Sequence, residues 1–517
     1  MSCFRAAVCA ALFLFGVSGP VVGQDVTLSS PDGAIEVTGD LLGFDGEFYR
    51  VETQFGELTV DGSGVRCEGP GCPSLSDFVA EITLSGSSTM AEVLLPALIE
   101  GFALRNGYQT AREQSQPRQF EYTLSRNGAA AARFIFYVSN TDEGFADLLA
   151  NQADIVMALR EIREAERILA REAGMGDMSV ANRGRVLALD AIVPIVAPTN
   201  PIGRISLPQL ARIYAGQITN WSDLGGPDAP IAVHLLVDGA GLTQAVEDKL
   251  LRPANLALAE GIRRHDRGSS LVRTVATDPF AIGIASFAET GTARMLTLTG
   301  ACGFSLSASR RMIKTEDYPL TSPMFLYLPA RRLPRVARDF LTYVRGPSAQ
   351  IVIRRAGFVD QAAERIPMAI QGERLSNAIK SAGQDVPLAE LQRMMTGLDG
   401  LQRLTLSFRF EAGSARPDAQ SRSNIDLLAR AVEAGVYDGK RLVFVGFSDG
   451  EGPAEVNRVI ALKRAETVRN SVEKAAETAS LDRISIETEA FGEALPIACD
   501  TSAWGRQANR RVEVWVR

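Results

Sequence analysis

The 517-residue sequence is poor in the residues that build metal sites and catalytic centres. It has two histidines, His234 and His265, and six cysteines, and no cysteine pair lies near another pair or a histidine. A structural zinc site needs four such ligands at short spacings, so we expect no metal and no cofactor. Neither histidine lies in a recognisable triad, and the "GSS" motif lacks the Gly-x-Ser-x-Gly pattern of a nucleophile elbow. A binding protein is therefore favoured over an enzyme.

Blocks of positive charge and long internal apolar runs are also missing. Lys and Arg total 54 against 61 Asp and Glu, a net charge of −7, which makes nucleic acid an unlikely partner. No run after the N-terminus approaches the roughly 18 apolar residues of a membrane helix. Residues 1–23 combine Arg5, the apolar "AAVCAALFLFGV" and the small residues "VVG" before Gln24, which predicts a secretory signal. We expect a soluble, exported mature protein.

Residues 24–78 predict a small β module. Short alternating runs such as "AIEVTG" and "EFYRVETQFGELTV" are separated by "PDG" and "DGSG" turns. Cys67 and Cys72 enclose "EGPG", and an oxidising compartment favours a disulfide between them. Cys302 and Cys499 stand alone; they are either buried small apolar residues or a bridge between two distant domains.

The remaining chain predicts a multidomain protein of α/β and α+β class. Residues 79–365 alternate short strands with amphipathic helices, which is typical of an α/β architecture. Residues 366–400 have the short, mixed-charge helical pattern of a connector. Residues 401–517 follow the order strand, helix (about 416–434), strand, helix (about 454–474), strand, strand. This last unit is expected to be a compact βαβαββ domain.

One stretch of the last unit, "GFSDGEGPAEVNRVIALKRAETV", predicts a binding site for a zwitterion. Asp449 follows the strand "RLVFVGF" on a Gly-rich turn, and Asn457 and Arg464 lie on the next helix. Positions 457 and 464 are about two helical turns apart, so they share one face. A carboxylate and a guanidinium held together fit a ligand that carries an ammonium and a carboxylate, such as an amino-acid terminus.

This unit resembles the OmpA-like peptidoglycan-binding family. The resemblance rests on the quoted stretch, on "FGEALP" and on "GRQANRRVEVWV". It implies that Asp449 and Arg464 clamp the amino and carboxylate groups of diaminopimelate in the peptide stem, with Asn457, Asn509 and Arg510 as further wall-binding residues. The family often has His-Thr before the Asp and Leu-Ser on the helix, where this chain has Phe447-Ser448 and Ile460-Ala461. For the "NRR" of the final strand, an alternative is that one Arg simply pairs with the acidic turn.

The unit at 79–365 begins with a predicted anion cradle. In "ITLSGSSTMAEVLLPALIEGF" a strand ends in a turn of Gly86, Ser87, Ser88 and Thr89, which opens a helix with an expected apolar face of Val93, Leu94, Ala97, Leu98 and Phe102. Backbone N–H groups at a helix start, together with hydroxyls, bind anions without a cationic side chain. The alternative is that Ser and Thr here are ordinary helix caps.

The same unit is similar to the phosphate-binding branch of the type 2 periplasmic solute-binding proteins, in which two α/β lobes close over an oxyanion. The resemblance rests on motifs that follow in order, of which "ITNWSDLGGPDAP" is the most specific. It implies ligand contacts from Gly86 to Thr89, from Ser139, Asn140 and Thr141, and from Gly241 and Thr243. The family's Arg is missing from the last turn, where this chain reads "VDGAGLT". Arg160 and Arg267 are the candidates to replace it.

Together these patterns predict a solute-binding protein of the periplasm that captures phosphate or a related oxyanion and is held on the cell wall of a Gram-negative envelope. An ABC permease is a possible partner. A receptor that must diffuse to a permease rarely needs a wall anchor, so the alternative is an envelope scaffold or sensor that uses a degenerate binding fold without transport.

Overall fold

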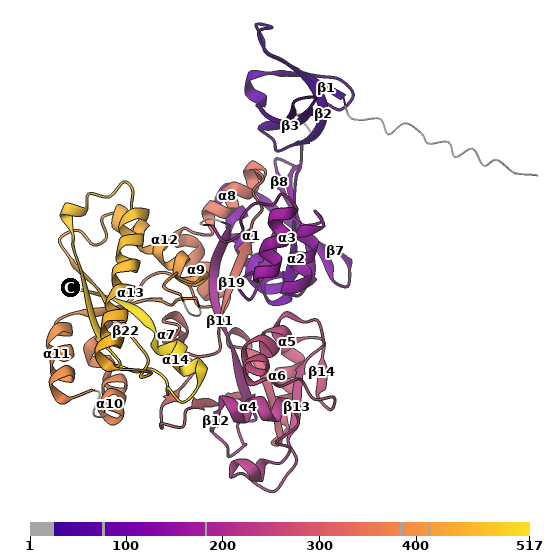
Figure 1. Cartoon of the computed structure of the whole chain (residues 1–517). Helices are drawn as coiled ribbons and strands as arrows, with labels where there is room; N and C mark the ends of the chain where they lie inside the picture. Colours follow the sequence, from indigo (N-terminus) through magenta and orange to yellow (C-terminus); the bar gives the residue numbers. More distant parts are fainter. Residues whose placement is uncertain (1–24, 75–77, 181–182, 383–385, 412–413) are drawn as a thin grey trace, which may run out of the picture. The chain divides into compact units, whose positions relative to one another are not determined.

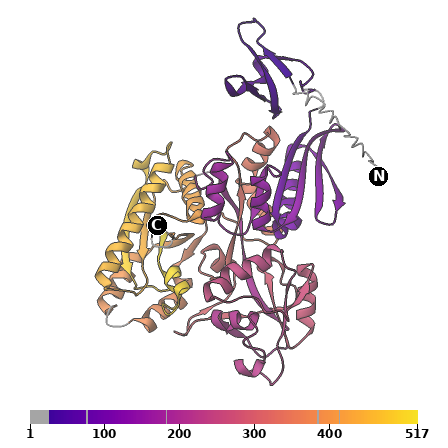
Figure 2. The same cartoon turned by 45° about the vertical axis from the view of Figure 1, so that its right-hand side comes forward.

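The computed structural model describes residues 25–74, 78–180, 183–382, 386–411 and 414–517 (Figures 1 and 2). The predicted signal sequence at 1–23 lies outside these residues. The chain divides into two compact units, residues 1–80 and 81–517, and each is treated by itself.

The N-terminal unit is the predicted β module. Its strands are β1 (Asp25–Ser29), β2 (Glu36–Phe44), β3 (Phe48–Thr53), β4 (Gly56–Asp61) and β5 (Arg66–Glu68). They pair antiparallel in the order β4-β3-β2-β1-β5, and alternate residues enter a small core of Val26, Leu28, Tyr49 and Val51. The predicted Cys67–Cys72 disulfide is confirmed. A sheet this small buries little apolar surface, and the covalent bridge adds to its stability by constraining the unfolded chain.

The second unit begins with two α/β lobes. Lobe 1 contains β6 (Ala80–Ser87), β7 (Gln109–Gln116), β8 (Gln119–Arg126), β9 (Ala129–Ser139), β10 (Ile155–Ala158), β19 (Thr321–Tyr327), α1 (Leu95–Asn106), α2 (Thr141–Leu149), α3 (Glu164–Glu172), α8 (Arg335–Tyr343) and α9 (Pro347–Arg355). Lobe 2 contains β12 (Arg204–Ser206), β13 (Ala232–Leu236), β14 (Arg263–His265), β15 (Ala281–Ser286), β16 (Arg294–Met295), β17 (Thr297–Thr299), β18 (Ser305–Leu306), α4 (Leu207–Tyr214), α5 (Gly241–Val246), α6 (Gly268–Thr277) and α7 (Arg310–Lys314).

One long strand, β11 (Gly184–Val196), joins the lobes. Its first part, up to Ala191, pairs with β19 of lobe 1, and residues Ile192–Val196 pair with β15 of lobe 2. The strand order β14-β13-β15-β11-β19-β10-β6-β9-β8-β7 therefore runs through both lobes. The carboxyl end of β6 and the ends of β13, β14 and β15 face the space between the lobes, as expected for ligand sites in α/β sheets.

The C-terminal domain is a sheet covered on both faces. Its elements are β20 (Arg365–Pro367), α10 (Gly372–Ser381), α11 (Leu388–Leu398), β21 (Gln402–Phe408), α12 (Ala419–Glu433), β22 (Arg441–Phe447), α13 (Ala454–Ala475), β23 (Ser485–Gly492), α14 (Ala503–Asn509) and β24 (Arg511–Val516). The strands pair in the order β20-β21-β24-β22-β23. Leu442 and Phe444 of β22 pack against α12 and α13, whereas Val443 and Val445 pack against α10 and α11. This alternation follows from the two-residue period of a strand.

The segment at 366–400 differs from the expected connector. Ile366 lies in β20, which pairs with β21, and Ala378, Met394 and Leu398 of α10 and α11 are buried against the sheet. Val443, Val445 and Trp515 form an apolar face of the sheet, and these two helices bury it. The segment is therefore part of the C-terminal domain.

The C-terminal domain is fastened to both lobes. Cys302, in the loop between β17 and β18, forms a disulfide with Cys499, which settles the open question about these cysteines. Arg422 of α12 pairs with Glu161 of lobe 1 at 2.7 Å. In the described part of the chain, no helix is both long and apolar enough to cross a membrane.

Candidate functional site

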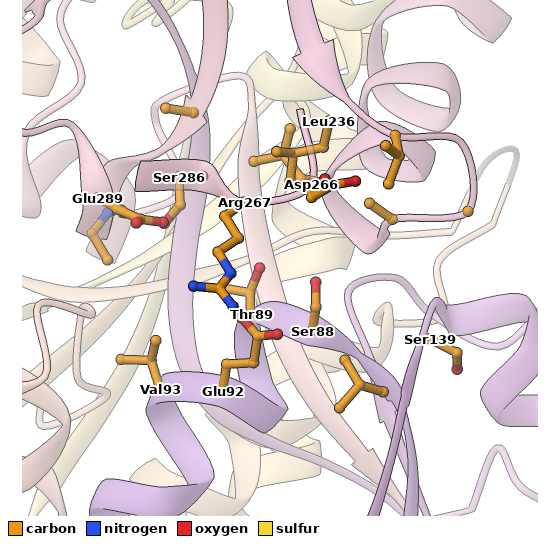
Figure 3. Close-up of a pocket in the computed structure, with 18 of the residues that line it drawn as sticks. Ser88, Thr89, Glu92, Val93, Ser139, Leu236, Asp266, Arg267, Ser286 and Glu289 are labelled. Carbon is orange, nitrogen blue, oxygen red and sulfur yellow. Dashed lines mark hydrogen bonds between the residues drawn. The ribbon is translucent and has the colours of Figure 1, made fainter. Parts of the chain in front are cut away.

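A cavity of about 480 Å³ lies between the two lobes (Figure 3). Ser88 and Thr89, at the end of β6, line it from lobe 1. Arg267, immediately before α6, lines it from lobe 2, and its side chain extends across the cavity toward Thr89. The cavity therefore brings together one of the predicted hydroxyl turns and one of the two predicted replacement cations.

The hydroxyls of Ser88 and Thr89 are not used as helix caps. The chain enters a π-helical turn (Met90–Leu94) before α1, and Thr89, at its start, makes no side-chain capping bond. Neither hydroxyl has a hydrogen-bond partner among the described residues, so both are available to a ligand. Val93 differs from the prediction: it is exposed and lines the cavity, because the π turn rotates it off the buried face of the helix.

Several other predicted turn residues pack between the lobes instead of lining this cavity. Asn140 caps α2 and donates to the Gly239 carbonyl oxygen of lobe 2 at 3.2 Å, and the Thr141 N–H donates to Gln244 Oε1 at 3.1 Å. The Thr243 hydroxyl is buried and donates to the Leu236 carbonyl oxygen at 3.0 Å. From this set of turn residues, Ser139 lines the cavity.

Gly86 and Ser87 are fixed by close packing of the backbone. Gly86 has φ of +128°, and a Cβ there would lie 2.2 Å from the Met157 carbonyl oxygen of β10. Ser87 is fully buried, and a Cβ at Gly241 would lie 3.3 Å from its Oγ. Gly86 lets β6 approach β10, and Gly241 lets the start of α5 approach Ser87 of β6; Ser87 Oγ is left without a hydrogen-bond partner.

The two candidate cations have different surroundings. Arg160 forms ion pairs with Asp142, Glu166 and Asp248 and lines a separate cavity of about 210 Å³. Arg267 has no carboxylate within ion-pair distance among the described residues. The turn that lacks the family's Arg is itself neutralised, because Asp238 pairs with Arg264 at 2.7 Å. Of these two candidates, Arg267 is therefore the cation that the cleft offers to a ligand.

Three acidic residues of the cavity were not predicted from the sequence. Glu92, Asp266 and Glu289 are exposed and line it, and Figure 3 shows Glu92 on the lobe 1 side and the other two on the lobe 2 side. Burial, and then the charge of Glu92, raise the pKa of Glu289. Asp266 lies between β14 and α6, directly before Arg267. A charged pair at such a strand-to-helix junction could have been identified from the sequence pattern.

A second site lies at one edge of the C-terminal sheet. Asp449 follows β22 and pairs with Arg510, which directly precedes β24. Arg464 of α13 is half-buried, with its guanidinium 5.3 Å from the centre of the Phe410 ring. Burial, and then the charge of Arg510, lower the pKa of Arg464, while Asp449 opposes this shift. Asp449 and Arg464 are thus brought together as the sequence predicted.

The other predicted wall-binding residues have structural partners. Asn457 donates to the Gly452 carbonyl oxygen at 3.5 Å and helps to close the turn before α13. Asn509 is fully buried; it accepts hydrogen bonds from the Ile497 and Ala498 N–H groups and donates to Asp500. Its side chain has no free group for a ligand, contrary to the expectation.

For the two arginines of "NRR", the alternative interpretation holds. Arg510 pairs with the acidic turn at Asp449, and Arg511 is fully buried and pairs with Glu513 at 2.8 Å. Arg510 nevertheless stays at the rim of the site, since its side chain is 32% exposed.

Asp500 supports the turn that carries Asp449. One of its carboxylate oxygens accepts a hydrogen bond from the Gly450 N–H at 2.9 Å, and the other accepts from Asn509. The neighbouring residue, Cys499, is bridged to Cys302 of lobe 2. The loop that holds this turn is therefore covalently tied to the neighbouring domain. Among the described residues, no group of three or more His, Cys, Asp and Glu side chains is placed to hold a metal ion.

Two family models match this chain. Residues 63–347 match the PBP superfamily domain, and residues 409–510 match the OmpA family. The first match covers more than half of the chain and includes both lobes and the cleft. The second includes Asp449, Arg464 and Asn509.

The chain is also similar to individual proteins, several of which have names that refer to phosphate. It is 24% identical over 250 residues to protein SphX of Synechococcus elongatus, which covers 45% of this chain and 71% of that protein. It is 28% identical over 163 residues to the phosphate-binding protein PstS of Bacillus subtilis, covering 31% and 52% respectively. Among solved structures, an ABC-type phosphate transport receptor from Vibrio cholerae matches 54% of this chain and 99% of its own, at 21% identity and a TM-score of 0.42.

Proposed function

Because the chain belongs to the PBP superfamily and carries a C-terminal OmpA family domain, we propose that it is a wall-anchored solute receptor of the cell envelope. The cleft binds phosphate or a related oxyanion, and the C-terminal domain holds the protein on peptidoglycan without a covalent bond. The predicted signal sequence directs the chain to the periplasm of a Gram-negative cell, where its expected partner is an ABC permease.

The observation that carries the proposal is the unpaired Arg464 beside Asp449. In the described structure no carboxylate lies within ion-pair distance of Arg464, although its guanidinium is half-buried against Phe410. A partly buried guanidinium without a counter-ion favours an incoming carboxylate, and Asp449 favours an ammonium. The free end of a diaminopimelate side chain carries both groups.

Replacing either charged residue is expected to abolish most wall binding. Asp449→Ala or Arg464→Ala leaves one charge of the zwitterionic ligand without compensation, which costs about 1.5–3 kcal/mol for each charged hydrogen bond lost. Binding is measured by co-sedimentation of the mature protein with purified peptidoglycan.

Two exposed residues of the same domain serve as controls. Lys463→Ala removes the cation next to Arg464, and Asp482→Ala removes a carboxylate far along the chain from Asp449. Both variants should sediment like the parent protein. Wild-type sedimentation of a folded Asp449→Ala/Arg464→Ala double variant would refute the anchor.

The cleft supports the other half of the proposal through Ser88, Thr89 and Arg267. Two hydroxyls without internal partners and one unpaired guanidinium face the same cavity from opposite lobes. An oxyanion there would receive charge-assisted hydrogen bonds from both lobes, which is how a ligand stabilises a two-lobed receptor.

Loss of these groups should weaken oxyanion binding. Ser88→Ala and Thr89→Ala are each expected to cost about 1.5–3 kcal/mol if the hydroxyl bonds a charged ligand. Arg267→Gln should cost at least as much, whereas Arg273→Gln, on the exposed side of the same helix, should have no effect. Calorimetry with inorganic phosphate and the mature protein measures all four. Unchanged affinity in the three cleft variants would remove these residues from the site.

The second candidate function is an envelope scaffold without transport. It is favoured by the disulfide and ion pair that fasten the C-terminal domain to both lobes, because a receptor that hands solute to a permease must open and close. A protein that binds no oxyanion in the calorimetry but still sediments with peptidoglycan would support the scaffold.

A further inference from the structure

We propose that the cleft takes a zwitterionic organic molecule, with an oxyanion at one end and an ammonium group at the other, in preference to inorganic phosphate. This inference rests on the proposed function, since it assumes that the interlobe cavity is a ligand site. It concerns the chemical class of the ligand, which the phosphate-related names of the relatives do not predict.

The first observation is the size of the cavity. Its volume of about 480 Å³ lies in the range of roughly 300–1,000 Å³ typical of sites for organic ligands. An inorganic phosphate ion has only five non-hydrogen atoms and would occupy a small part of this space. Apolar residues, including Val93, Leu242 and Phe358, line part of the remainder. Such a lining suits the carbon skeleton of an organic ligand, because hydrated ions gain nothing from apolar contact.

The second observation is the distribution of charge. The carboxylates of Glu92, Asp266 and Glu289 outnumber the guanidinium groups of Arg118 and Arg267 among the lining residues. A phosphate dianion bound to Arg267 would share the partly desolvated cleft with these carboxylates and be repelled by them. A ligand that also carries an ammonium group would replace that repulsion by attraction.

Glu289 lies close to Arg267, so the group that would bind an ammonium is a neighbour of the group that would bind an oxyanion. Its carboxylate lies 2.3 Å from the position that a Cβ on Gly268 would take, so it is next to Arg267. Glu92 is close enough to Glu289 to raise its pKa, and Figure 3 shows it below the Arg267 guanidinium on the opposite lobe. Glu92 and Glu289 therefore form an acidic pair, contributed by both lobes, beside the oxyanion-binding groups.

The third observation is that several turn residues implied by the resemblance to phosphate-binding proteins already have partners inside the protein. Ser87 and Gly241 are packed against each other, and the Thr243 hydroxyl is bonded to the Leu236 carbonyl oxygen. Fewer turn residues remain for the oxyanion than the resemblance implies, namely Ser88, Thr89 and Ser139, beside the guanidinium groups of Arg118 and Arg267. A single carboxylate or phosphoryl end fits this smaller set, and the acidic pair supplies the rest of the recognition.

Matched pairs of probes test the inference on the mature full-length protein. O-phosphoethanolamine is compared with ethyl phosphate, and 4-aminobutyrate with butyrate, by calorimetry beside inorganic phosphate. We expect at least one zwitterion to bind about tenfold or more tightly than its partner without the ammonium group, and more tightly than inorganic phosphate. The pair that shows this difference identifies the oxyanion end as phosphoryl or carboxylate.

Variants assign the preference to the acidic pair. Glu92→Gln/Glu289→Gln should remove the advantage of the zwitterion and leave the anionic partner unaffected or tighter, whereas Arg267→Gln should weaken both. Both glutamates are exposed, so the double variant should fold normally, which circular dichroism checks.

The outcomes separate this inference from the proposed function. Equal binding within both pairs, or tightest binding of inorganic phosphate, would overturn the zwitterion inference and leave the oxyanion cleft in place. A zwitterion advantage that survives the double glutamine variant would also overturn it. Binding of none of the five probes would overturn the inference together with the proposed oxyanion function.

Discussion

Asp317→Ala is expected to lower the free energy of unfolding by about 3–5 kcal/mol, because it leaves the buried Arg403 guanidinium with only one of its two carboxylate partners, Glu513. Arg403 of β21 is 1% exposed, and it donates to the two carboxylate oxygens of Asp317 at 2.6 and 3.1 Å. Asp317 lies just before β19 and Arg403 in the C-terminal domain, so the pair joins the two. Urea denaturation of the mature protein measures the effect.

The pH dependence of this pair has a definite sign. Burial alone would raise the pKa of Asp317, yet the Arg403 guanidinium holds it well below its ordinary range. A carboxylate with a depressed folded-state pKa stabilises the protein above its unfolded pKa of about 3.9, and this contribution is lost as the pH falls toward the folded-state pKa. The difference between Asp317→Ala and the parent protein should therefore be full at neutral pH and shrink in acid.

An exposed ion pair of the same domain provides the control. Arg441 and Glu487 pair at 2.7 Å, with side chains 40% and 43% exposed. Glu487→Ala should cost less than about 1 kcal/mol, because exposed ion pairs contribute little. Asp317→Ala/Arg403→Met should recover much of the loss, since Glu513, the other carboxylate that pairs with Arg403, keeps Arg374 and Arg511 as partners and no buried charge is left unpaired. A cost for Asp317→Ala no larger than for Glu487→Ala would contradict the prediction.

Loss of the Cys302–Cys499 disulfide should have a similarly large effect. The two residues are 197 positions apart, so the bridge closes a long loop, and the chain-entropy relation gives about 5 kcal/mol for such a closure. Cys302→Ser/Cys499→Ser removes the bridge without leaving a free thiol. Denaturant unfolding of the oxidised mature protein, compared with this variant, measures the difference.

The other disulfide is the matched control. Cys67 and Cys72 are five positions apart, so Cys67→Ser/Cys72→Ser should cost roughly 2 kcal/mol by the same relation, within the N-terminal unit. If removing the long-range bridge costs no more than removing the short one, the disulfide does not constrain the arrangement of the second unit as we infer.

Helix positions in the C-terminal domain were predictable because their signals are local. Helices expected at about 416–434 and 454–474 are observed at Ala419–Glu433 and Ala454–Ala475. Apolar spacing and nearby Gly and Pro residues fix such boundaries within a few positions. The convergence of Asp449 and Arg464 was predictable for the same reason, since both lie on one strand-turn-helix segment.

The assignment of 366–400 as a connector was wrong because the role of this segment depends on residues far away in the chain. The pattern of α10 and α11 shows an amphipathic surface but not what covers it. The partner is the odd-numbered face of β22 and β24, including Val443 and Trp515, which follows much later in the chain. Asn509 was misjudged in the same way, because the carbonyl and N–H groups that saturate its side chain come from the loop at Ile497 and Ala498.

By itself the sequence determined the two main families of domain, the short-range disulfide and the turn that carries Asp449, because each is encoded within a segment whose spacing is read directly. Tertiary structure alone decided which cation faces the cleft, because Arg160 is neutralised by Asp142 and Asp248 while Arg267 has no such neighbour. It also decided the pairing of Cys302 with Cys499 and of Asp317 with Arg403. Those contacts join residues far apart in the chain, and they form only when both lobes and the C-terminal sheet have folded against one another.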